Sequence, residues 1–113
     1  MADVDCIFCR IASGEIPADV VYRDDDVVAF NDTNPQAPTH VLVVPRRHVA
    51  SAHELDDAPL TAALFAAMQR IADDRDLGDG YRVVTNIGPA AGQSVPHLHF
   101  HLLGGRTLGW PPG

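Results

Sequence analysis

Histidine alternates with apolar residues in segment 97–103, which reads HLHFHLL. Successive side chains of a β-strand point to opposite faces, so this order predicts a strand with three imidazoles on one face and apolar side chains on the other. The apolar face is what a core strand requires, whereas packing alone gives no reason for three histidines in register. The segment therefore predicts a half-buried strand that carries a functional surface.

Four more strands are expected from apolar runs elsewhere in the chain. They cover residues 20–22, 27–30, 39–45 and 81–85. The run over 39–45 is apolar on both faces, which is typical of a central or covered strand. Residues 31–35 are rich in side chains that bond their own backbone, and we expect a loop there.

Two helices are expected, one short and one long. Residues 6–13 are typical of a short helix that ends at Gly14. Apolar residues recur at helical spacing between Pro59 and Leu77, which predicts the long helix. Its expected limits are a cap at Asp56 or Asp57 and a terminator at Gly78. Five strands and one main helix predict an α+β fold in which an antiparallel sheet packs against the helix.

Length and charge narrow the classes of function. The 113 residues, 46% of them hydrophobic, are expected to form one domain over residues 1–113, which buries roughly two thirds of its unfolded surface. Met1–Asp5 lack the basic start of a signal peptide and no run approaches the ~20 apolar residues of a membrane helix, so we expect a cytoplasmic protein without a membrane partner. The net charge of -7 argues against a nucleic-acid partner, but a local pocket can still bind a small phosphate ligand.

Two chemistries use a row of imidazoles, namely metal binding and nucleophilic catalysis. His97 and His101 lie about 13 Å apart along a strand at ~3.3 Å per residue, too far for one ion to bind all three histidines. A neutral imidazole near pH 7 is available to attack phosphorus, and the bond it forms is labile enough for water to cleave later. The preceding loop Gly92-Gln93-Ser94 is expected to aim backbone N–H groups and the Ser94 hydroxyl at phosphate oxygens.

The HLHFHLL segment resembles the signature of the histidine-triad (HIT) family, His-x-His-x-His-x-x with apolar residues at x. The similarity extends over nearly the whole chain and points to the Hint branch. It rests on residues 7–8, 15–18, 35–40, 92–94 and 110–113. The resemblance implies a HIT-like fold, with a five-stranded antiparallel sheet, one long helix and a short N-terminal helix.

The same resemblance implies a covalent mechanism that needs no cofactor for catalysis. His99 matches the nucleophile that becomes nucleotidylated at the α-phosphorus before water regenerates it. His101 matches a residue that contacts the phosphate and assists proton transfer, and His40 matches an outlying histidine that helps to set protonation across the site. Ser94 lies where the family contacts the leaving group.

The resemblance also implies a slot for a purine nucleotide. Asp32 matches the carboxylate that binds the ribose hydroxyls, and Asn86 matches a polar residue beside the phosphate. The other residues expected at the nucleotide are Ile7, Phe8, Ile11, Ile16, Phe30, Thr33, Gly92, Gln93, Ser94, His99 and His101. For the apolar members, a place in the plain core is an equally good interpretation. Asn31 departs from animal Hint proteins, which usually carry histidine there.

From spacing alone, Cys6 and Cys9 allow a redox pair, half of a zinc site or two inert thiols. Bacterial proteins that this sequence resembles often hold a structural zinc ion, and the resemblance carries the ligand set onto Cys6, Cys9, His48 and His97. Four protein ligands make a closed tetrahedral site suited to structure rather than catalysis. His53 receives no role and is expected in solvent.

The C-terminal Trp110–Gly113 is expected to dock against protein, because tryptophan favours burial and prolines stiffen the chain. The resemblance implies a two-fold homodimer in which this tail reaches the partner's active site. The leading hypothesis is a hydrolase of purine nucleoside phosphoramidates. The alternatives are a dinucleoside polyphosphate hydrolase or nucleotidyl transferase, a zinc-stabilised nucleotide-binding adaptor without significant turnover and, ranked lowest, a metal-dependent hydrolase.

Overall fold

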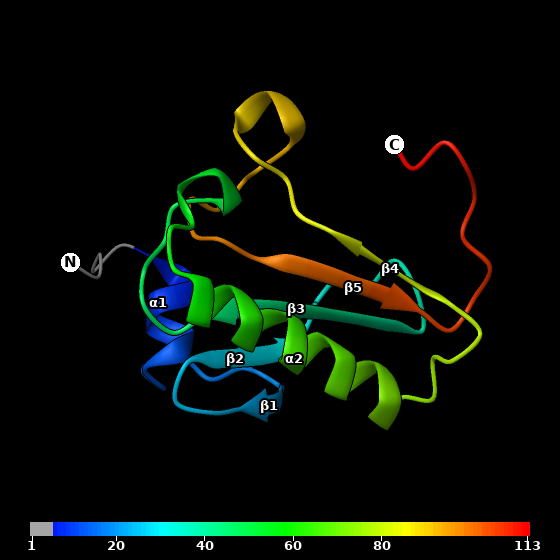
Figure 1. Cartoon of the computed structure of the whole chain (residues 1–113), viewed down its shortest axis with the longest axis horizontal. Coiled ribbons are helices and arrows are strands. Elements are labelled where there is room, and N and C mark those ends of the chain that lie inside the picture. The colour runs from blue at the N-terminus through cyan, green and yellow to red at the C-terminus, as the bar shows by residue number, and fades with distance from the viewer. Residues whose placement is uncertain (1–5) are drawn as a thin grey trace.

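The computed structural model describes residues 6–113, so the expectation about Met1–Asp5 lies outside the described residues. Five strands and two α-helices make up the fold (Figure 1). In chain order they are α1 (Ile7–Ala12), β1 (Val20–Arg23), β2 (Val27–Asn31), β3 (Thr39–Pro45), α2 (Ala58–Asp74), β4 (Tyr81–Val84) and β5 (Phe100–Gly104), with 3-10 turns η1 (Ala52–Glu54) and η2 (Pro89–Ala91). None of the described helices is long and apolar enough to cross a membrane.

The strands form one antiparallel sheet in the order β1-β2-β3-β5-β4. The α+β fold expected from the sequence is therefore confirmed. Strand β3 lies at the centre and all seven of its residues are buried, which explains why its sequence is apolar on both faces. Because β3 pairs with β5, this pairing fixes the position of the C-terminal histidines along the sheet.

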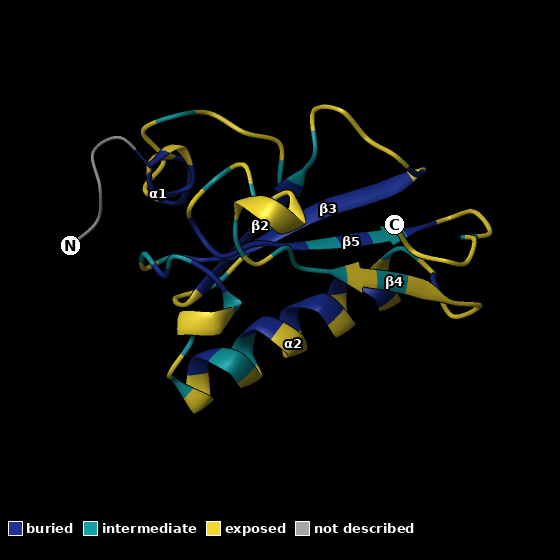
Figure 2. Cartoon of the chain, turned by 90° about the horizontal axis from the view of Figure 1, so that it is seen from above, coloured by how far each residue is buried: buried dark blue, intermediate teal, exposed yellow. Residues whose placement is uncertain are grey.

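The two faces of the sheet have separate cores (Figure 2). Helix α2 covers one face, where Leu64 and Met68 pack with Leu98 and Leu102. Helix α1 covers part of the opposite face, where its side chains join those of β2 and β3. Full burial of each large apolar side chain contributes about 1.5–3 kcal/mol. The apolar residues of segment 97–103 thus serve the α2 core and leave the histidines to the α1 face.

Helix α2 begins as expected but ends earlier. The Asp57 side chain accepts a hydrogen bond from the Leu60 N–H at 3.0 Å, so Asp57 is the cap. The helix ends at Asp74, and Asp76 adopts the left-handed conformation with φ 59°. The Leu77 N–H then donates to the Ala72 carbonyl at 3.0 Å, as in a Schellman motif. Gly78 as terminator was therefore wrong, because an aspartate tolerates the left-handed conformation that the turn needs.

The last strand also begins later than expected, at Phe100 rather than His97. Continuing the β3–β5 register beyond Val43 and Phe100 would place Pro45 opposite Leu98, and proline has no N–H for the ladder. Leu98 instead donates its N–H to the Val49 carbonyl at 2.6 Å. The side chains of residues 97–99 still alternate between the two faces of the sheet, although these residues are not part of the regular ladder.

Candidate active site and metal centre

The imidazoles of segment 97–103 lie on the α1 side of the sheet, as their alternation predicts. The ring of Phe8 in α1 contacts the His97 and His99 rings edge-on, at centroid distances of 5.9 and 5.1 Å. The His101 ring lies 5.2 Å from the His99 ring and 5.2 Å from the His40 ring of β3. A row of four imidazoles therefore crosses this face, and the Phe8 ring contacts both His97 and His99.

His99, in the middle of the row, is held in one tautomer. Its Nδ1 lies 2.8 Å from the His97 carbonyl oxygen, which can only accept, so Nδ1 carries the proton. In the neutral ring Nε2 then keeps the lone pair. The His99 carbonyl accepts the Thr85 hydroxyl at 2.8 Å. Side chain and backbone of this residue are thus both fixed, and only 6% of its surface is exposed.

His40 and His101 form a second ordered pair. The Gln36 N–H donates to His40 Nδ1 at 3.0 Å, so the proton of neutral His40 lies on Nε2. That Nε2–H donates to His101 Nδ1 at 2.9 Å, which leaves the other nitrogen of His101, Nε2, with its proton. Asp32 Oδ2 lies 3.4 Å from His40 Nε2. The row therefore presents a lone pair on His99 and an N–H on His101 from adjacent rings.

Burial keeps this pair neutral. Desolvation lowers the pKa of His40, and the negative charge of Asp32 opposes the shift. Desolvation, followed by the nearby His99 and His40, lowers the pKa of His101, while Asp32 again opposes the shift. Both imidazoles are neutral near pH 7, because neutral histidine already predominates at that pH. Asp32 nevertheless provides a charge that stabilises a proton taken up by the pair.

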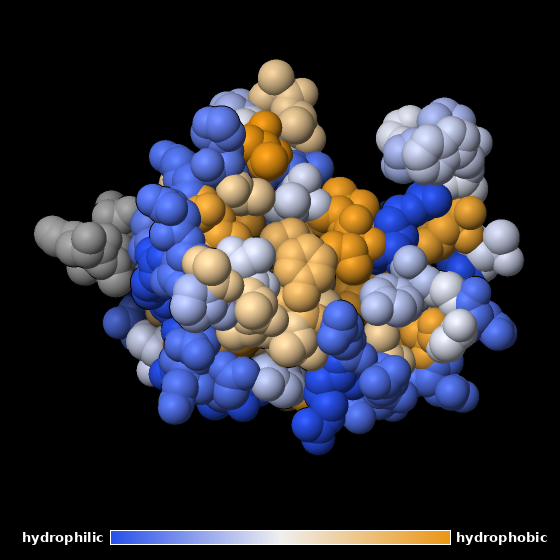
Figure 3. Space-filling model, in the orientation of Figure 1, coloured by the Kyte–Doolittle hydropathy of each residue, from blue (hydrophilic) through white to orange (hydrophobic). Residues whose placement is uncertain are grey.

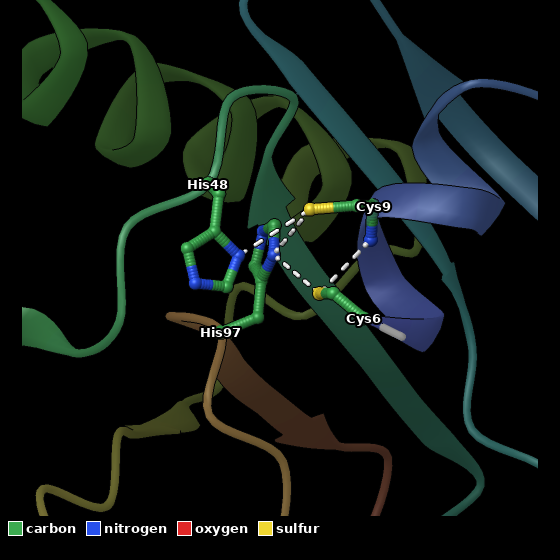
Figure 4. Close-up of side chains that lie close together, drawn as sticks. All are labelled: Cys6, Cys9, His48 and His97. Atoms are coloured by element: carbon green, nitrogen blue, oxygen red, sulfur yellow. Dashed lines mark hydrogen bonds between the residues drawn. The ribbon is translucent and has the colours of Figure 1, made fainter. Parts of the chain in front are cut away.

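Cys6, Cys9, His48 and His97 converge beneath α1, and their ligand atoms all lie within 4.8 Å of one another (Figure 4). Cys6 Sγ lies 3.2 Å from His97 Nδ1, and Cys9 Sγ lies 3.4 Å from the same atom and 3.3 Å from His48 Nδ1. Both cysteines are buried thiols rather than a disulfide. The four residues come from three separate segments, which the fold brings to one point.

The donor set fits a tetrahedral zinc ion. Zn–S and Zn–N bonds of ~2.3 and ~2.05 Å place sulfur and nitrogen ligands about 3.5 Å apart, close to the separations in this cluster. His97 Nε2–H donates to the Pro45 carbonyl at 3.0 Å, so Nδ1 faces the thiols without a proton. Such a bond to the far nitrogen is the usual outer support of a metal-bound histidine. Burial also lowers the pKa of His97 to about 4, which keeps the ring neutral.

Asp32, His40 and His101 form a second cluster whose ligand atoms lie within 4.8 Å of one another. Its hydrogen bonds argue against a metal ion. A metal at His40 Nε2 would displace the proton from that atom, and the Gln36 N–H prevents the proton from moving to Nδ1. The proton on His40 Nε2 is therefore held in place, and this nitrogen has no lone pair to offer a cation.

The loop before the histidines corrects one expectation. The N–H groups of Gly92 and Gln93 do not point to a phosphate position, because they donate to the carbonyls of Pro89 and Gly88 at 3.0 and 3.1 Å. The Gln93 side chain accepts from the Gly88 N–H and donates to the Ala50 carbonyl at 2.7 Å, which ties the loop to the body of the protein. Ser94 is exposed and remains the candidate of this loop for a ligand contact.

The residues expected around a nucleotide have different environments. Phe8, Ile11 and Phe30 are buried together in the α1 core, with Ile16 packed at its edge. Ile7 is 45% exposed and Thr33 is also exposed, so neither is a core residue. Asn86 is partly buried beside Gly92, because a Cβ added to Gly92 would lie 3.9 Å from Asn86 Nδ2. Of these residues, Phe8 is the one whose ring contacts the histidine row, at His97 and His99.

Asp32 and Asn31 face different ways at the end of β2. Asp32 Oδ1 accepts the Asn34 N–H at 2.8 Å, which turns the chain and leaves Oδ2 near His40. Asn31 instead donates its amide to Asp19 at 2.7 Å and accepts from Arg75 at 3.3 Å. The side chain of Asn31 is therefore occupied in linking β2 to the end of α2.

Three further features lie away from the row. His53 is exposed on η1, as expected. Trp110 is 84% exposed, so the expectation that the tail docks does not hold within a single chain. Two surface cavities, of about 570 and 440 Å³, lie elsewhere: Tyr81, Arg82 and Arg106 help to line the first, and Arg46, Arg47 and Asp57 the second.

Sequence reasoning missed the groups that orient the imidazoles. The Thr85 hydroxyl holds the backbone of His99, the Gln36 N–H fixes the tautomer of His40, and the Pro45 carbonyl fixes that of His97. Two of these three are backbone groups, which carry no signal in residue identity. The contact between Thr85 and His99 could have been predicted only from the pairing of β4 with β5, since these two residues are far apart in sequence.

Comparison with known proteins matches this fold and site to one family. The HIT domain profile matches residues 13–108. An uncharacterized HIT-like protein of Synechococcus elongatus is 50% identical over 111 residues, which cover 96% of this chain and 97% of the relative. A 14 kDa zinc-binding protein of Zea mays is 48% identical over 116 residues, covering 98% and 90% of the two chains. The crystal structure of a HIT family hydrolase from Legionella pneumophila superposes with a TM-score of 0.93 at 46% identity, over 96% of this chain and 100% of that one.

The histidine row and the sheet that carries it thus place the protein in a known class, the histidine-triad proteins. The chain belongs to the HIT family.

Proposed function

We propose that the protein hydrolyses purine nucleoside phosphoramidates, of the adenosine 5′-phosphoramidate type, through a nucleotidyl intermediate on His99, as in the Hint branch. The observation that carries this proposal is the pair of complementary tautomers. His99 offers a lone pair at Nε2, and His101 offers an N–H at Nε2 from the next ring. A nucleophile beside a proton donor is what displacement at phosphorus requires.

The reaction proceeds in two balanced steps. His99 Nε2 attacks the α-phosphorus, a phosphorus–nitrogen bond to the ring forms, and the bond to the leaving nitrogen breaks. The anionic phosphoryl group favours uptake of a proton by the His40–His101 pair, and His101 Nε2–H passes a proton to the leaving nitrogen. Water then attacks phosphorus, the bond to His99 breaks, and the proton from water returns to the pair.

Asp32 supports this proton balance, because its carboxylate lies 3.4 Å from His40 Nε2 and favours the charged form of both histidines. We further propose that its exposed edge binds the ribose and that Phe8, Ile11, Ile16 and Phe30 lie toward the base. Ser94 is proposed at the leaving group and Asn86 beside the phosphate.

The test is intact-mass measurement after rapid mixing with an adenosine phosphoramidate. The expected result is an adduct of one adenylyl group that maps to His99 and then decays to free enzyme. His99→Ala should form no adduct, whereas His53→Ala, which removes an exposed imidazole, should behave as wild type. An adduct on another residue, or turnover that survives in His99→Ala, would falsify the proposal.

The same assay separates the candidate leaving groups. Phosphoramidates release an amine, whereas dinucleoside polyphosphates release a nucleotide from the same proposed intermediate. Faster adduct formation with phosphoramidates supports the Hint-type activity. A preference for diadenosine polyphosphates would instead assign the protein to nucleotidyl transfer or polyphosphate hydrolysis.

We also propose that Cys6, Cys9, His48 and His97 hold a structural zinc ion. The support is the separation of their ligand atoms and the bare Nδ1 that His97 turns to the thiols. Elemental analysis of purified protein should give one zinc per chain. No protein residue beyond these four is required, so the proposed site is closed to substrate.

A homodimer is proposed from the exposed apolar side chains along one side of the molecule. Tyr81 and Val83 of the edge strand β4 are 41% and 37% exposed, and Phe65 of α2 is 46% exposed. Apolar side chains gather over α2 in the space-filling view (Figure 3). A partner that covers this surface would also meet the exposed Trp110. Light scattering should give twice the chain mass, and Val83→Lys should shift it to the monomer.

A further inference from the structure

Besides the His101 ring, which lies 5.2 Å from the His99 ring, three contacts of different origin hold His99. Its Nδ1–H donates to the His97 carbonyl at 2.8 Å, its ring receives the edge of Phe8 at 5.1 Å, and its carbonyl accepts the Thr85 hydroxyl at 2.8 Å. Thr85 follows the edge strand β4. The other two contacts come from residues at the cysteine–histidine cluster.

The cluster reaches His99 by two independent routes. Along the chain, His97 supplies a ring nitrogen to the cluster and its own carbonyl to His99. Through space, Phe8 lies between Cys6 and Cys9 on α1, and its ring touches both His97 and His99. Whatever fixes the two cysteines and His97 therefore also fixes the His97 carbonyl and the Phe8 ring against His99.

We propose that the Cys6, Cys9, His48 and His97 cluster is a metal-dependent positioning device for His99, in which His97 and Phe8 are the positioning residues. The inference rests on the proposed role of His99 as nucleophile. With a metal ion bound, the cluster would keep the Nδ1–H tautomer of His99, whose lone pair lies on Nε2. The ion would thus matter for the state of the active site as well as for folding.

The weakness of α1 on its own is the physical basis of the device. The helix has six residues, far below the ~12–15 needed for marginal stability in isolation. Without a metal ion, its links to His97 and His48 are hydrogen bonds between thiol groups and imidazole nitrogens, with Sγ–Nδ1 distances of 3.2–3.4 Å, and such bonds are weak. Loss of these links would let Phe8 and the His97 carbonyl shift, and a displacement of about 1 Å at a reacting group costs on the order of 10²-fold in rate.

The first test compares zinc-loaded and chelator-stripped protein by ¹⁵N NMR of the histidine rings, with the His99 signals assigned from the His99→Gln variant. We expect the Nδ1–H tautomer alone in the loaded protein and a mixture of tautomers in the stripped protein. Identical His99 spectra in the two states would overturn the inference. So would a protein that takes up no zinc. This readout does not depend on turnover.

The second test follows the rate of adenylyl transfer to His99 in single turnovers, together with the affinity for AMP. Stripping should lower the rate by about 10²-fold and change AMP affinity little, because the ligand contacts proposed for Asp32 and Asn86 do not come from the cluster. If no adduct forms in either state while the tautomer still responds to zinc, the proposed function fails, whereas control of the His99 ring by the metal cluster is still supported.

Variants separate positioning from plain stabilisation. Phe8→Leu keeps an apolar side chain and removes the ring edge, so the effect of zinc on the rate should shrink from about 10²-fold to about tenfold, a coupling that a double-mutant cycle detects. Thr85→Val removes a contact that does not come from the cluster and should leave the zinc effect at its wild-type size. An equal zinc effect in wild type and Phe8→Leu would assign the ion to folding alone.

Discussion

His97 and His40 stand at opposite ends of the histidine row and use their ring nitrogens in opposite ways. His97 donates from Nε2 to the Pro45 carbonyl and turns a bare Nδ1 to the thiols. His40 accepts at Nδ1 from the Gln36 N–H and donates from Nε2 to His101. A carbonyl in one place and an amide in the other therefore decide which imidazole suits a metal and which carries a proton.

The partners on each side agree with this division. Two thiols, which favour soft metal ions such as zinc, lie beside His97, whereas a carboxylate that can balance a transferred proton lies beside His40. His99 lies between the two regions and is bonded to His97 on one side and in ring contact with His101 on the other. Substitutions at the His40 end should therefore leave zinc binding intact, whereas substitutions at the His97 end should affect zinc binding first and activity only through the position of His99.

The largest expected effect is on turnover, from His101→Ala. Loss of the proposed proton donor should lower the rate of phosphoramidate hydrolysis by about 10²–10⁴-fold, while zinc content stays at the wild-type value. Steady-state kinetics and elemental analysis of the same preparation test both statements. A variant that lost zinc together with activity would show that the two regions are not separable.

The next largest effect is expected on zinc binding at the His97 end of the row, and Cys9→Ser tests it. Replacing a thiolate ligand should weaken zinc binding by at least about 10²-fold, and added zinc should no longer raise the melting temperature, since a ligand stabilises only the state that binds it. A zinc titration followed by thermal unfolding measures this, with Ser13→Ala, a change at the exposed end of α1, as the matched control. Undiminished zinc stabilisation in Cys9→Ser would remove Cys9 from the ligand set.

Much of the fold that separates the two ends of the row could be predicted from the sequence, and the predictions that failed did so for physical reasons. The alternation over residues 97–103 places apolar side chains in the α2 core, and the structure agrees even though the ladder begins only at Phe100. The end of α2 was misassigned, because glycine is only one way to reach a left-handed turn and Asp76 provides another.

The roles within the site depend on contacts that sequence does not record. The Gly92-Gln93-Ser94 loop was expected to aim backbone N–H groups and the Ser94 hydroxyl at a phosphate, but the N–H groups of Gly92 and Gln93 close turns within the loop. The tautomers of His40 and His97 depend on backbone atoms of Gln36 and Pro45, whose positions follow only from the folded chain. Residue type predicts which chemistry is available, and tertiary contacts decide which nitrogen performs it.

A smaller effect should come from the backbone at the His40 end of the histidine row. Gln36→Pro removes the N–H that holds His40 Nδ1 as an acceptor, so the proton can move to Nδ1 and expose Nε2 beside Asp32 and His101. Zinc above one equivalent should then inhibit turnover at roughly tenfold lower concentration than in wild type, because a three-ligand site becomes available. Gln36→Ala retains the amide and should match wild type. Equal inhibition of all three proteins would mean that the amide does not choose the tautomer.

The smallest expected effect is a dependence of stability on pH that comes from His40 and His101. Burial lowers the pKa of His40 and His101, whereas the unfolded chain has histidines near 6.5. Between the native pKa values and about 6.5, the unfolded state binds more protons, so the free energy of unfolding should fall as pH drops through that window and reach its full value above it. Urea unfolding of zinc-loaded protein from pH 7.5 downward measures the slope. His101→Asn should flatten it and His53→Asn should not, so an unchanged slope in His101→Asn would place the proton uptake at another group.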